Sequence, residues 1–532
     1  MSSSVGVETP WLQTPLFGDW AATLELNRST ITLTLLLVVV VPVVASALLG
    51  SKGSRLPVVN VPGPFQLEIQ KKFEFVQDGM KFLREGRQRF PGKPFVLVTN
   101  SGRITIMPPD RAQEIKGLST LCFRKAFCFV APLMPGLGTL EIIDHPNELV
   151  QKVVTKHLTK RLNTVTEPLA IETSFAVSKS LGEKNDWAEV TIYEALLDIV
   201  ARISTRVFLG PDICRDEAWL EITKNFTVAQ SRSLATMKLF PYYLRPLVYF
   251  LDPNGRKTVR LFYEARKMVE PLVARRRRER QEPGAPAYND AIEWADLECG
   301  GQPFDATDFQ LALASVAIHT TTDLVSKTLM HLAAGDPENI EALRQEMIDV
   351  LPANGWKKTS LTRMILLDSA IKEAQRMKPI LMTNMLRKAT ADTKLEGGIV
   401  LRKGEMLAVD AGNLHDPAVY ENPDVYDMRR FANMRSSGGG MEHRAHLVSA
   451  VPEHITFGYG KHVCPGRFFA ANEIKMALCH LLMNYDWKIA PGTTLEPTWV
   501  GTDMLFNQQA KMLCRSRRAE FDLDSLEVDD TE

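Results

Sequence analysis

One cysteine of this chain is placed as a thiolate ligand would be. Cys464 lies in the segment FGYGKHVCPGR, where Gly458 and Gly460 allow a tight turn and a close approach of the backbone to a flat cofactor. Pro465 suits the first position of a helix, and apolar residues recur at helical spacing after it, so the sequence predicts a buried helix that starts at the cysteine. Free backbone N–H groups and the positive end of the helix dipole would then hold the sulfur as a thiolate.

The same segment resembles the F-x-x-G-x-x-x-C-x-G signature of the cytochrome P-450 monooxygenases, with Phe457, Gly460, Cys464 and Gly466 at the fixed positions. The resemblance implies haem b with Cys464 as the axial ligand, an arrangement that favours O–O cleavage over reversible O2 storage. Members of the family usually have arginine two residues before the cysteine. This chain has His462 there, and we expect it to bond a haem propionate.

A second candidate site lies in a predicted helix over residues 306–334, which Asp305 and Asp308 are placed to cap. Its middle, VAIHTTT, puts a histidine and three threonines at poor helix-forming positions. Taken alone, these hydroxyls would bond carbonyls one turn earlier and merely bend the helix. The resemblance implies instead that Thr320 faces the iron and couples O2 reduction to product formation. His319 stands where many members carry an acid, and it either assists proton transfer or makes a helix contact.

Glu373 and Arg376 lie three residues apart on one helix face, a pattern that is usually a solvated surface bridge. The family, however, follows its E-x-x-R pair with an aromatic-D-x-x-R-[FY] turn, and residues 426–431, YDMRRF, fit that turn. The resemblance therefore implies that Arg430 joins Glu373 and Arg376 in a buried structural triad. It also places Arg387 at a haem propionate, together with Lys152 or Lys156.

The N-terminal region has the composition of a membrane anchor. Residues 29–50 are uncharged and mostly apolar, and as a helix the run from Ile31 to Leu49 would measure about 28 Å, close to the hydrocarbon thickness. We expect residues 1–28 to be a lumenal tail and residues 51–64 a proline-rich hinge before a cytosolic domain at the endoplasmic reticulum membrane. A cleaved signal peptide is the alternative, but the acidic residues before the run disfavour it.

Composition indicates one large intracellular domain. Lys plus Arg equals Asp plus Glu, 63 of each, so the chain has no net positive charge that would favour binding to nucleic acid. The seven cysteines contain no C-x-x-C pair and suit a reducing compartment. The resemblance implies the mostly α cytochrome P-450 fold over residues 65–519, with a small β lobe near 65–115 and 380–411. We expect the acidic residues 520–532 to be disordered and Arg275 to Arg278 to be a solvated helix end.

A large lipophilic substrate is predicted, because the segments that line the distal pocket in the family are apolar here. They comprise Phe123, Phe127, Phe129 and Met134, residues 380–385 and residues 504–506. The hinge, the AIHTT helix and the cysteine loop look most like fungal secondary-metabolism members related to ent-kaurene oxidase. We therefore expect a terpenoid or indole-terpenoid substrate, with a polyketide or alkaloid as the alternative.

The resemblance implies electron supply from NADPH through a membrane-bound cytochrome P-450 reductase, with cytochrome b5 as a further partner. Lys461, Arg467 and Lys475 lie around the predicted cysteine loop and would attract an acidic flavoprotein. A haem-thiolate protein can also isomerise, dehydrate or use peroxide without a reductase, or only sense or carry haem. The threonine run favours O2 activation, and the apolar pocket segments disfavour a sensor or carrier.

Overall fold

The central element of the structure is the long helix α13 (Ala306–Ala334), whose predicted bounds are confirmed. The computed structural model describes residues 56–63, 66–128 and 134–527. Asp305 caps α13, because its carboxylate accepts hydrogen bonds from the N–H groups of Thr307 at 2.8 Å and Asp308 at 3.0 Å. Asp308 lies inside the first turn and does not cap the helix, contrary to its predicted role.

Helices make up most of the described chain. They are α2 (Glu68–Arg89), α3 (Ala112–Ile115), α4 (Phe123–Cys128), α5 (Gly138–Glu141), α6 (Leu149–Lys152), α7 (Leu162–Leu181), α8 (Ile192–Phe208), α9 (Glu217–Leu239), α10 (Arg245–Leu251), α11 (Pro253–Glu279), α12 (Ala291–Glu298), α13, α14 (Pro337–Asn354), α15 (Lys358–Arg363), α16 (Ile365–Met377), α17 (Arg430–Ser436), α18 (Glu442–Ala445) and α19 (Arg467–Asn484). A π-helical turn, η3 (Val153–Leu158), follows α6.

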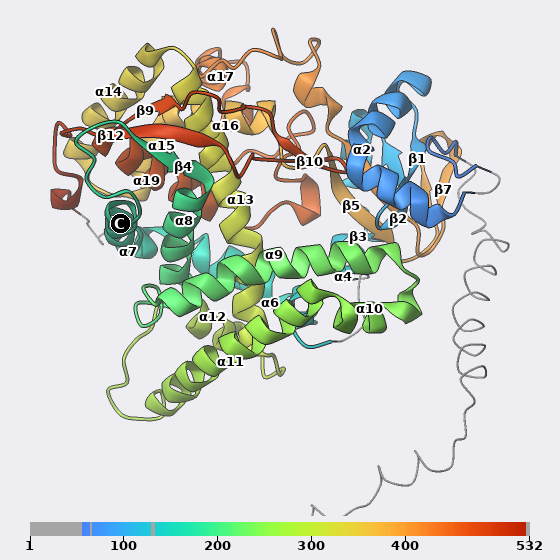
Figure 1. Ribbon diagram of the computed structural model, residues 1–532, viewed down its shortest axis with the longest axis horizontal. Helices are drawn as coiled ribbons and strands as arrows, with labels where there is room; N and C mark the ends of the chain where they lie inside the picture. The colour runs from blue at the N-terminus through green and yellow to red at the C-terminus, as the bar shows by residue number, and fades with distance from the viewer. Residues whose placement is uncertain (1–55, 64–65, 129–133, 528–532) are drawn as a thin grey trace, which may run out of the picture. The chain divides into compact units, whose positions relative to one another are not determined.

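The helices around α13 form the main core. α8, α9, α11, α16 and α19 all contact α13, and Figure 1 shows α13 running from the bundle that contains α16 and α19 to the green helices α9 and α11. The largest apolar cluster joins Leu313 and Leu329 of α13 to Ile474 and Leu478 of α19, all nearly inaccessible to solvent. Burial of each such side chain contributes about 1.5–3 kcal/mol, so the core fixes α13 against α19.

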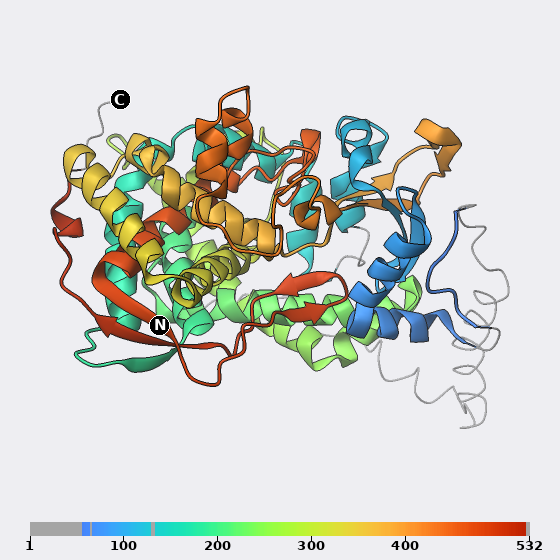
Figure 2. The same ribbon diagram turned by 90° about the horizontal axis from the view of Figure 1, so that it is seen from above.

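A five-stranded sheet forms the predicted β lobe, at the opposite end of the described unit from α14 in both views (Figures 1 and 2). The strand order is β1-β2-β8-β5-β3, and only β2 and β8 pair in parallel, with Ile104 opposite Met406. Its strands are β1 (Phe95–Thr99), β2 (Gly102–Met107), β3 (Leu121–Cys122), β5 (Thr383–Ala389) and β8 (Met406–Asp410). The sheet therefore combines the two sequence regions in which a β lobe was predicted.

Three smaller sheets complete the fold. The order β4-β12-β9 forms one sheet, and β6–β7 and β10–β11 form antiparallel pairs. The strands are β4 (Ala188–Thr191), β6 (Thr393–Leu395), β7 (Ile399–Leu401), β9 (Tyr485–Ile489), β10 (Thr498–Val500), β11 (Asp503–Leu505) and β12 (Lys511–Ser516).

The segment predicted as a hinge is partly folded. Residues 56–63 contain no helix, as expected, but Val58 bridges Val96, and the Asn60 side chain bonds both backbone groups of Val98 in β1. These residues thus extend the sheet instead of serving as a free hinge. The predicted membrane anchor, residues 29–50, lies outside the described residues. Within the described part of the chain, no helix is both long and apolar enough to cross a membrane.

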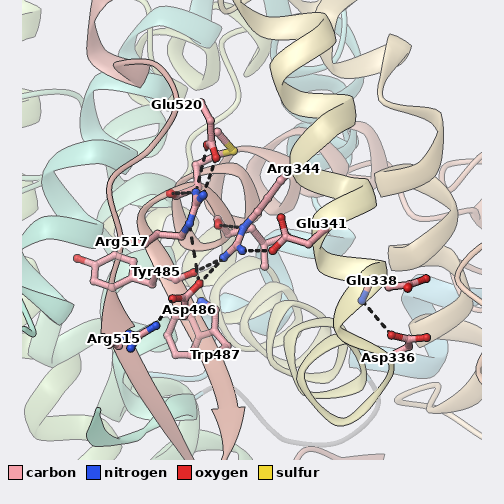
Figure 3. A network of polar contacts seen from close by, with 12 residues as sticks. Asp336, Glu338, Glu341, Arg344, Tyr485, Asp486, Trp487, Arg515, Arg517 and Glu520 are labelled. Carbon is pink, nitrogen blue, oxygen red and sulfur yellow. Dashed lines mark hydrogen bonds and ion pairs between the residues drawn. The ribbon is translucent and has the colours of Figure 1, made fainter. Parts of the chain in front are cut away.

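The beginning of the acidic tail is also folded, so the prediction of disorder from residue 520 onward is wrong for residues 520–527. The Trp356 indole N–H donates to the carbonyl of Leu523 at 3.0 Å, and the Leu523 side chain is buried. Glu520 pairs with Arg517 at 2.6 Å in the network of Figure 3, where Arg344 of α14 also reaches Asp486 of β9. Among the acids that indicated disorder, Glu520 is therefore paired with an arginine of the folded domain, and Asp524 accepts a hydrogen bond from Ser174 at 2.9 Å.

One residue of the predicted solvated helix end is buried. The Arg276 guanidinium is 1% exposed and pairs with Asp290 at 2.5 Å, whereas its neighbours Arg275 and Arg277 pair with acids at the surface. Four arginines in a row look alike in the sequence. Because successive helical residues point in different directions, only Arg276 among them points into the core.

Candidate active site

The cysteine loop is closed by its own backbone. The Cys464 N–H donates to the carbonyl of Phe457 at 2.8 Å, and the Gly458 N–H donates to Ile455 at 2.8 Å. Gly458 and Gly460 have φ values of 75° and 76°, the left-handed region in which glycine is favoured. At Gly460 a Cβ would also lie 2.4 Å from Cβ of Lys116, so this glycine is required by packing against the neighbouring loop as well as by the turn.

The helix after the cysteine begins later than predicted. α19 starts at Arg467 with Gly466 as its N-cap, so Pro465 is not the first helical residue. The intervening turn aims backbone N–H groups of Gly466 and Arg467 at the sulfur. Burial raises the pKa of the Cys464 thiol, while these two N–H groups and the Arg467 charge lower it. The donors expected at a helix start thus offset the effect of burial in part, although the helix itself begins three residues further on.

Across the core, the middle of α13 has one open face. Val316 is 47% exposed and Thr320 is exposed, whereas Ile318, Thr321 and Thr322 are buried. Positions 316 and 320 are one turn apart, so they share a side of the helix. The Thr320 hydroxyl donates to the carbonyl of Val316 at 2.8 Å, which is the back-bond expected from the residues alone. Its oxygen keeps lone pairs that can accept a hydrogen bond from a molecule on this face.

His319 points elsewhere, and both of its ring nitrogens are engaged. Nε2 lies 3.2 Å from the carbonyl of Lys224 in α9, and Nδ1 lies 3.1 Å from the Tyr193 hydroxyl in α8. Because a carbonyl only accepts, Nε2 carries the hydrogen and Nδ1 accepts from tyrosine, an assignment made from the partners. Burial lowers the pKa of His319, so the ring is neutral. Of the two predicted roles, the structure contains the helix contact.

Arg387 is a buried cation with free donors. Its side chain is 2% exposed and bonds the carbonyl of Leu386 at 2.9 Å, while Nε and one terminal nitrogen have no hydrogen-bond partner among the described residues. A bulge between Asn384 and Arg387, with Met385 at φ 53°, interrupts the pairing of β5 at this point. Burial lowers the pKa of Arg387 to about 10. A buried guanidinium with unfilled donors fits a carboxylate ligand, as a haem propionate would supply.

His462 lies near this cation and is neutral at physiological pH. Burial and then the charge of Arg387 lower the pKa of His462 to about 4. The ring of Phe123 lies 6.4 Å from the His462 ring. Arg387 is therefore the buried cation at this place, and His462 can contribute a neutral hydrogen bond. Lys156, which was predicted as an alternative propionate partner, instead pairs with Glu298 of α12 at 3.0 Å.

The structure brings the three members of the predicted triad together. Arg376 makes two hydrogen bonds of 2.8 Å to the two oxygens of Glu373, and Arg430 reaches Glu373 at 3.0 Å. The Glu373 and Arg376 side chains are fully buried. Arg376 also donates to the carbonyls of Leu414 and Pro423 in the long loop before the cysteine segment. This arrangement can fix that loop, a structural task and not a catalytic one.

Sequence reasoning missed a buried carboxyl behind the open face of α13. Glu473 of α19 is fully buried and accepts a hydrogen bond from Ser204 of α8 at 2.6 Å, while its second oxygen has no partner among the described residues. Burial raises the pKa of Glu473 to about 8, so it is protonated at neutral pH. The signal available in the sequence was that Glu473 is the one acidic residue of α19.

Comparisons with known proteins agree with this architecture. The family model described as "Cytochrome P-450" matches residues 146–515. The monooxygenase hepE of Aspergillus oryzae is 40% identical over 481 residues, covering 88% of this chain and 87% of that protein. Monooxygenase 1 of Gibberella fujikuroi is 38% identical over 437 residues, covering 81% of this chain and 99% of that protein. The retinoic acid-bound cyanobacterial CYP120A1 shares the fold, with a TM-score of 0.62, 18% identity and coverage of 87% of this chain and 100% of that one.

The chain therefore belongs to the cytochrome P-450 family and is a monooxygenase. Proteins of this family use haem held by a cysteine thiolate and electrons supplied by a reductase, and Cys464 is the residue of this chain that would hold the iron. When bound, such a thiolate-ligated haem activates O2. The open face of α13, the loop that presents Cys464 and the free donors of Arg387 fit this group.

Proposed function

We propose that this protein inserts one oxygen atom from O2 into a large lipophilic substrate, a terpenoid or indole-terpenoid of a fungal secondary-metabolite pathway. The observation that carries the proposal is the open face of α13, where Val316 presents apolar surface beside the hydroxyl of Thr320. Such a surface binds hydrocarbon by burial and uses few polar groups to orient it. The likeness of the hinge and the cysteine loop to members related to ent-kaurene oxidase supports the terpenoid class.

In this proposal each residue has a limited task. Cys464 holds the iron, Arg387 and His462 bind the propionates, and Phe457, Gly460 and Gly466 shape the loop under the macrocycle. Thr320 accepts a hydrogen bond at its hydroxyl oxygen and so holds a water molecule at the open face. Glu373, Arg376 and Arg430 keep the cysteine loop in place. His319 is assigned to the contact between helices, and no proton transfer is assigned to it.

Electrons are proposed to come from a membrane-bound NADPH reductase, with cytochrome b5 as a further donor, at the endoplasmic reticulum membrane. Lys461 is exposed and available for an acidic partner. Lys475 is not, because it is buried and pairs with Asp368 at 2.6 Å, and Arg467 is half-buried and bonds the carbonyls of Val448 and Cys464. Of the three residues predicted from the sequence to attract the partner, Lys461 is therefore the exposed one.

The test is NADPH-dependent turnover of terpenoid, polyketide and alkaloid panels by the full chain, with and without the reductase. Turnover that requires the reductase and is confined to terpenoids supports the proposal. Turnover without reductase would favour an isomerase, a dehydratase or, with peroxide, a peroxygenase. Turnover of polyketides or alkaloids alone would contradict the proposed terpenoid substrate and leave the monooxygenase assignment intact.

A further inference from the structure

A small cavity lies where α11 and α12 meet the residue before α7. Its lining comes from Arg161, from the C-terminal end of α11, from residues 286–288 of the following loop and from α12. Figure 1 shows this loop at the lower left, between the end of α11 and α12. The cavity measures about 220 Å³, below the range of about 300–1,000 Å³ that is typical of pockets for larger organic ligands. It therefore suits a small ligand, and it shares no residue with the candidate active site.

Two buried donors in the lining have no acceptor. The Trp294 side chain is 1% exposed, and its indole Nε1 has no hydrogen-bond partner among the described residues. The Arg276 side chain is also 1% exposed, and its Nε is likewise without a partner there. Buried N–H groups are nearly always satisfied by protein, water or a ligand. Two such donors at one cavity indicate that an acceptor binds in it.

Neighbouring contacts hold both donors in place. The Nη1 of Arg276 donates to Asp290 at 2.5 Å, and its guanidinium lies 4.1 Å from the centroid of the Tyr288 ring, which lines the same cavity. The Trp294 ring stacks on His157, with the two ring centroids 6.0 Å apart. Because these contacts fix both side chains, neither donor can rotate freely to find another acceptor.

The balance of charge favours an anion as this acceptor. Glu293, the acid in the lining, pairs with Arg280 at 2.6 Å, and Arg276 is paired with Asp290. Arg161 also lines the cavity and is exposed, and no acid of the described chain lies within ion-pair distance of it. A water molecule could accept from the two buried donors, but it would leave this charge unpaired. An oxyanion would satisfy the donors and pair with the guanidinium.

We propose that this cavity binds a phosphate group, whose oxygens accept from Trp294 Nε1 and Arg276 Nε while Arg161 pairs with its charge. The three side chains come from α12, from α11 and from the residue before α7, so the donors converge from separate elements. A tetrahedral phosphate offers acceptor oxygens in several directions, whereas both oxygens of a carboxylate lie in one plane. The site depends neither on the proposed substrate nor on haem chemistry.

The experiment follows inorganic phosphate by phosphorus NMR with the full-length holoprotein at constant ionic strength, with chloride as the balancing anion. The line width of the phosphate signal gives its dissociation constant. Arg161→Gln removes the exposed charge, and Trp294→Phe removes the indole N–H but keeps a ring against His157. Arg402→Gln is the matched control, since Arg402 is an exposed arginine that follows β7 in the β lobe. The haem content of each variant shows that it is folded.

We expect saturable broadening in wild type that sulfate, another tetrahedral oxyanion, reverses. Arg161→Gln should weaken the affinity about tenfold, as for a lost charged hydrogen bond, and Trp294→Phe about fivefold, as for a neutral one. Arg402→Gln should bind like wild type. Glycerol phosphate is the second probe. Its competition with inorganic phosphate would support a phosphate group carried by an organic molecule, and a lack of competition would support the free ion.

An absence of saturable broadening in wild type would overturn the proposal. Equal weakening in Arg161→Gln and Arg402→Gln would also overturn it, because it would show general attraction to positive charge. If Trp294→Phe failed to fold, Arg161→Gln would still decide, since its side chain is exposed, and wild-type affinity in that variant would contradict the site. No readout uses turnover, so failure of the proposed function would leave this test unaffected.

Discussion

Thr320 and His319 are adjacent in sequence but serve different sides of α13. The Thr320 side chain lies on the open face, whereas the His319 ring is held between Tyr193 of α8 and Lys224 of α9. About 100° of helical rotation separates neighbouring residues, which accounts for the difference. The two residues can therefore be tested separately, one for chemistry and the other for packing.

Substitution Thr320→Ala is expected to uncouple the enzyme. The variant should bind haem and substrate normally and consume NADPH, while more of the electrons end as peroxide, because no hydroxyl oxygen remains to hold water at the open face. Product and peroxide formed per NADPH measure this. Thr320→Ser should retain most coupling. Thr322→Ala is the matched control, since Thr322 makes the same back-bond, to Ile318 at 2.8 Å, on a buried face. Equal uncoupling in both alanine variants would contradict the assignment.

Substitution His319→Ala is expected to lower stability without uncoupling. It removes two buried hydrogen bonds and leaves the Tyr193 hydroxyl without its partner, a loss of about 2–3 kcal/mol in the free energy of unfolding. Thermal unfolding measures the loss, and peroxide per NADPH should stay at the wild-type level. Increased peroxide would show that the histidine moves protons after all.

The pH dependence of stability should also report on His319. Burial lowers its pKa below the unfolded value near 6.5, so the folded state binds fewer protons than the unfolded state as the pH falls. Its contribution to stability is therefore complete above that value and is lost as the pH drops toward the folded pKa. Between pH 7 and pH 5, His319→Gln should lose less stability than wild type. A steeper loss in the variant would contradict a neutral, buried ring.

Breaking the triad should prevent haem incorporation. Arg376→Ala leaves Glu373 buried with only Arg430 as a charged partner, a change that costs about 3–5 kcal/mol. We expect little soluble holoprotein, measured as haem per polypeptide. Lys511→Ala breaks the exposed pair with Glu189 and should cost less than about 1 kcal/mol with full haem content. Normal haem content in Arg376→Ala would show that the cluster does not hold the cysteine loop.

Arg387 should be needed to retain haem. Because His462 is neutral at pH 7, removing Arg387 leaves the propionate region without its buried charge. Transfer of haem to apomyoglobin should be about tenfold faster in Arg387→Ala, for a lost charged hydrogen bond of about 1.5 kcal/mol. His462→Arg should slow the transfer. A transfer rate in Arg387→Ala equal to wild type would place the propionates elsewhere.

The sequence predicted the elements better than their side-chain contacts. The cap residue and the apolar pattern of α13 are local signals, and they were sufficient for its bounds. The start of α19 was misplaced because Pro465 fits a helix start as well as the turn that precedes one. Lys475 appeared to be a surface charge near the loop, but its ion pair with Asp368 depends on the packing of α16 against α19, which no local pattern encodes. The burial of Glu473 was missed for the same reason.

The central claim is that Cys464 ligates haem iron as a thiolate, and the spectrum of the reduced protein with CO tests it most directly. Wild type should show the strongly red-shifted Soret band of thiolate ligation, and Cys464→Ala should lose that band together with monooxygenase activity. Cys479→Ala is the control, because Cys479 lies buried within α19, the helix that follows Cys464 in the chain. The account predicts a wild-type band in Cys479→Ala. A red-shifted band that persists in Cys464→Ala would contradict the account.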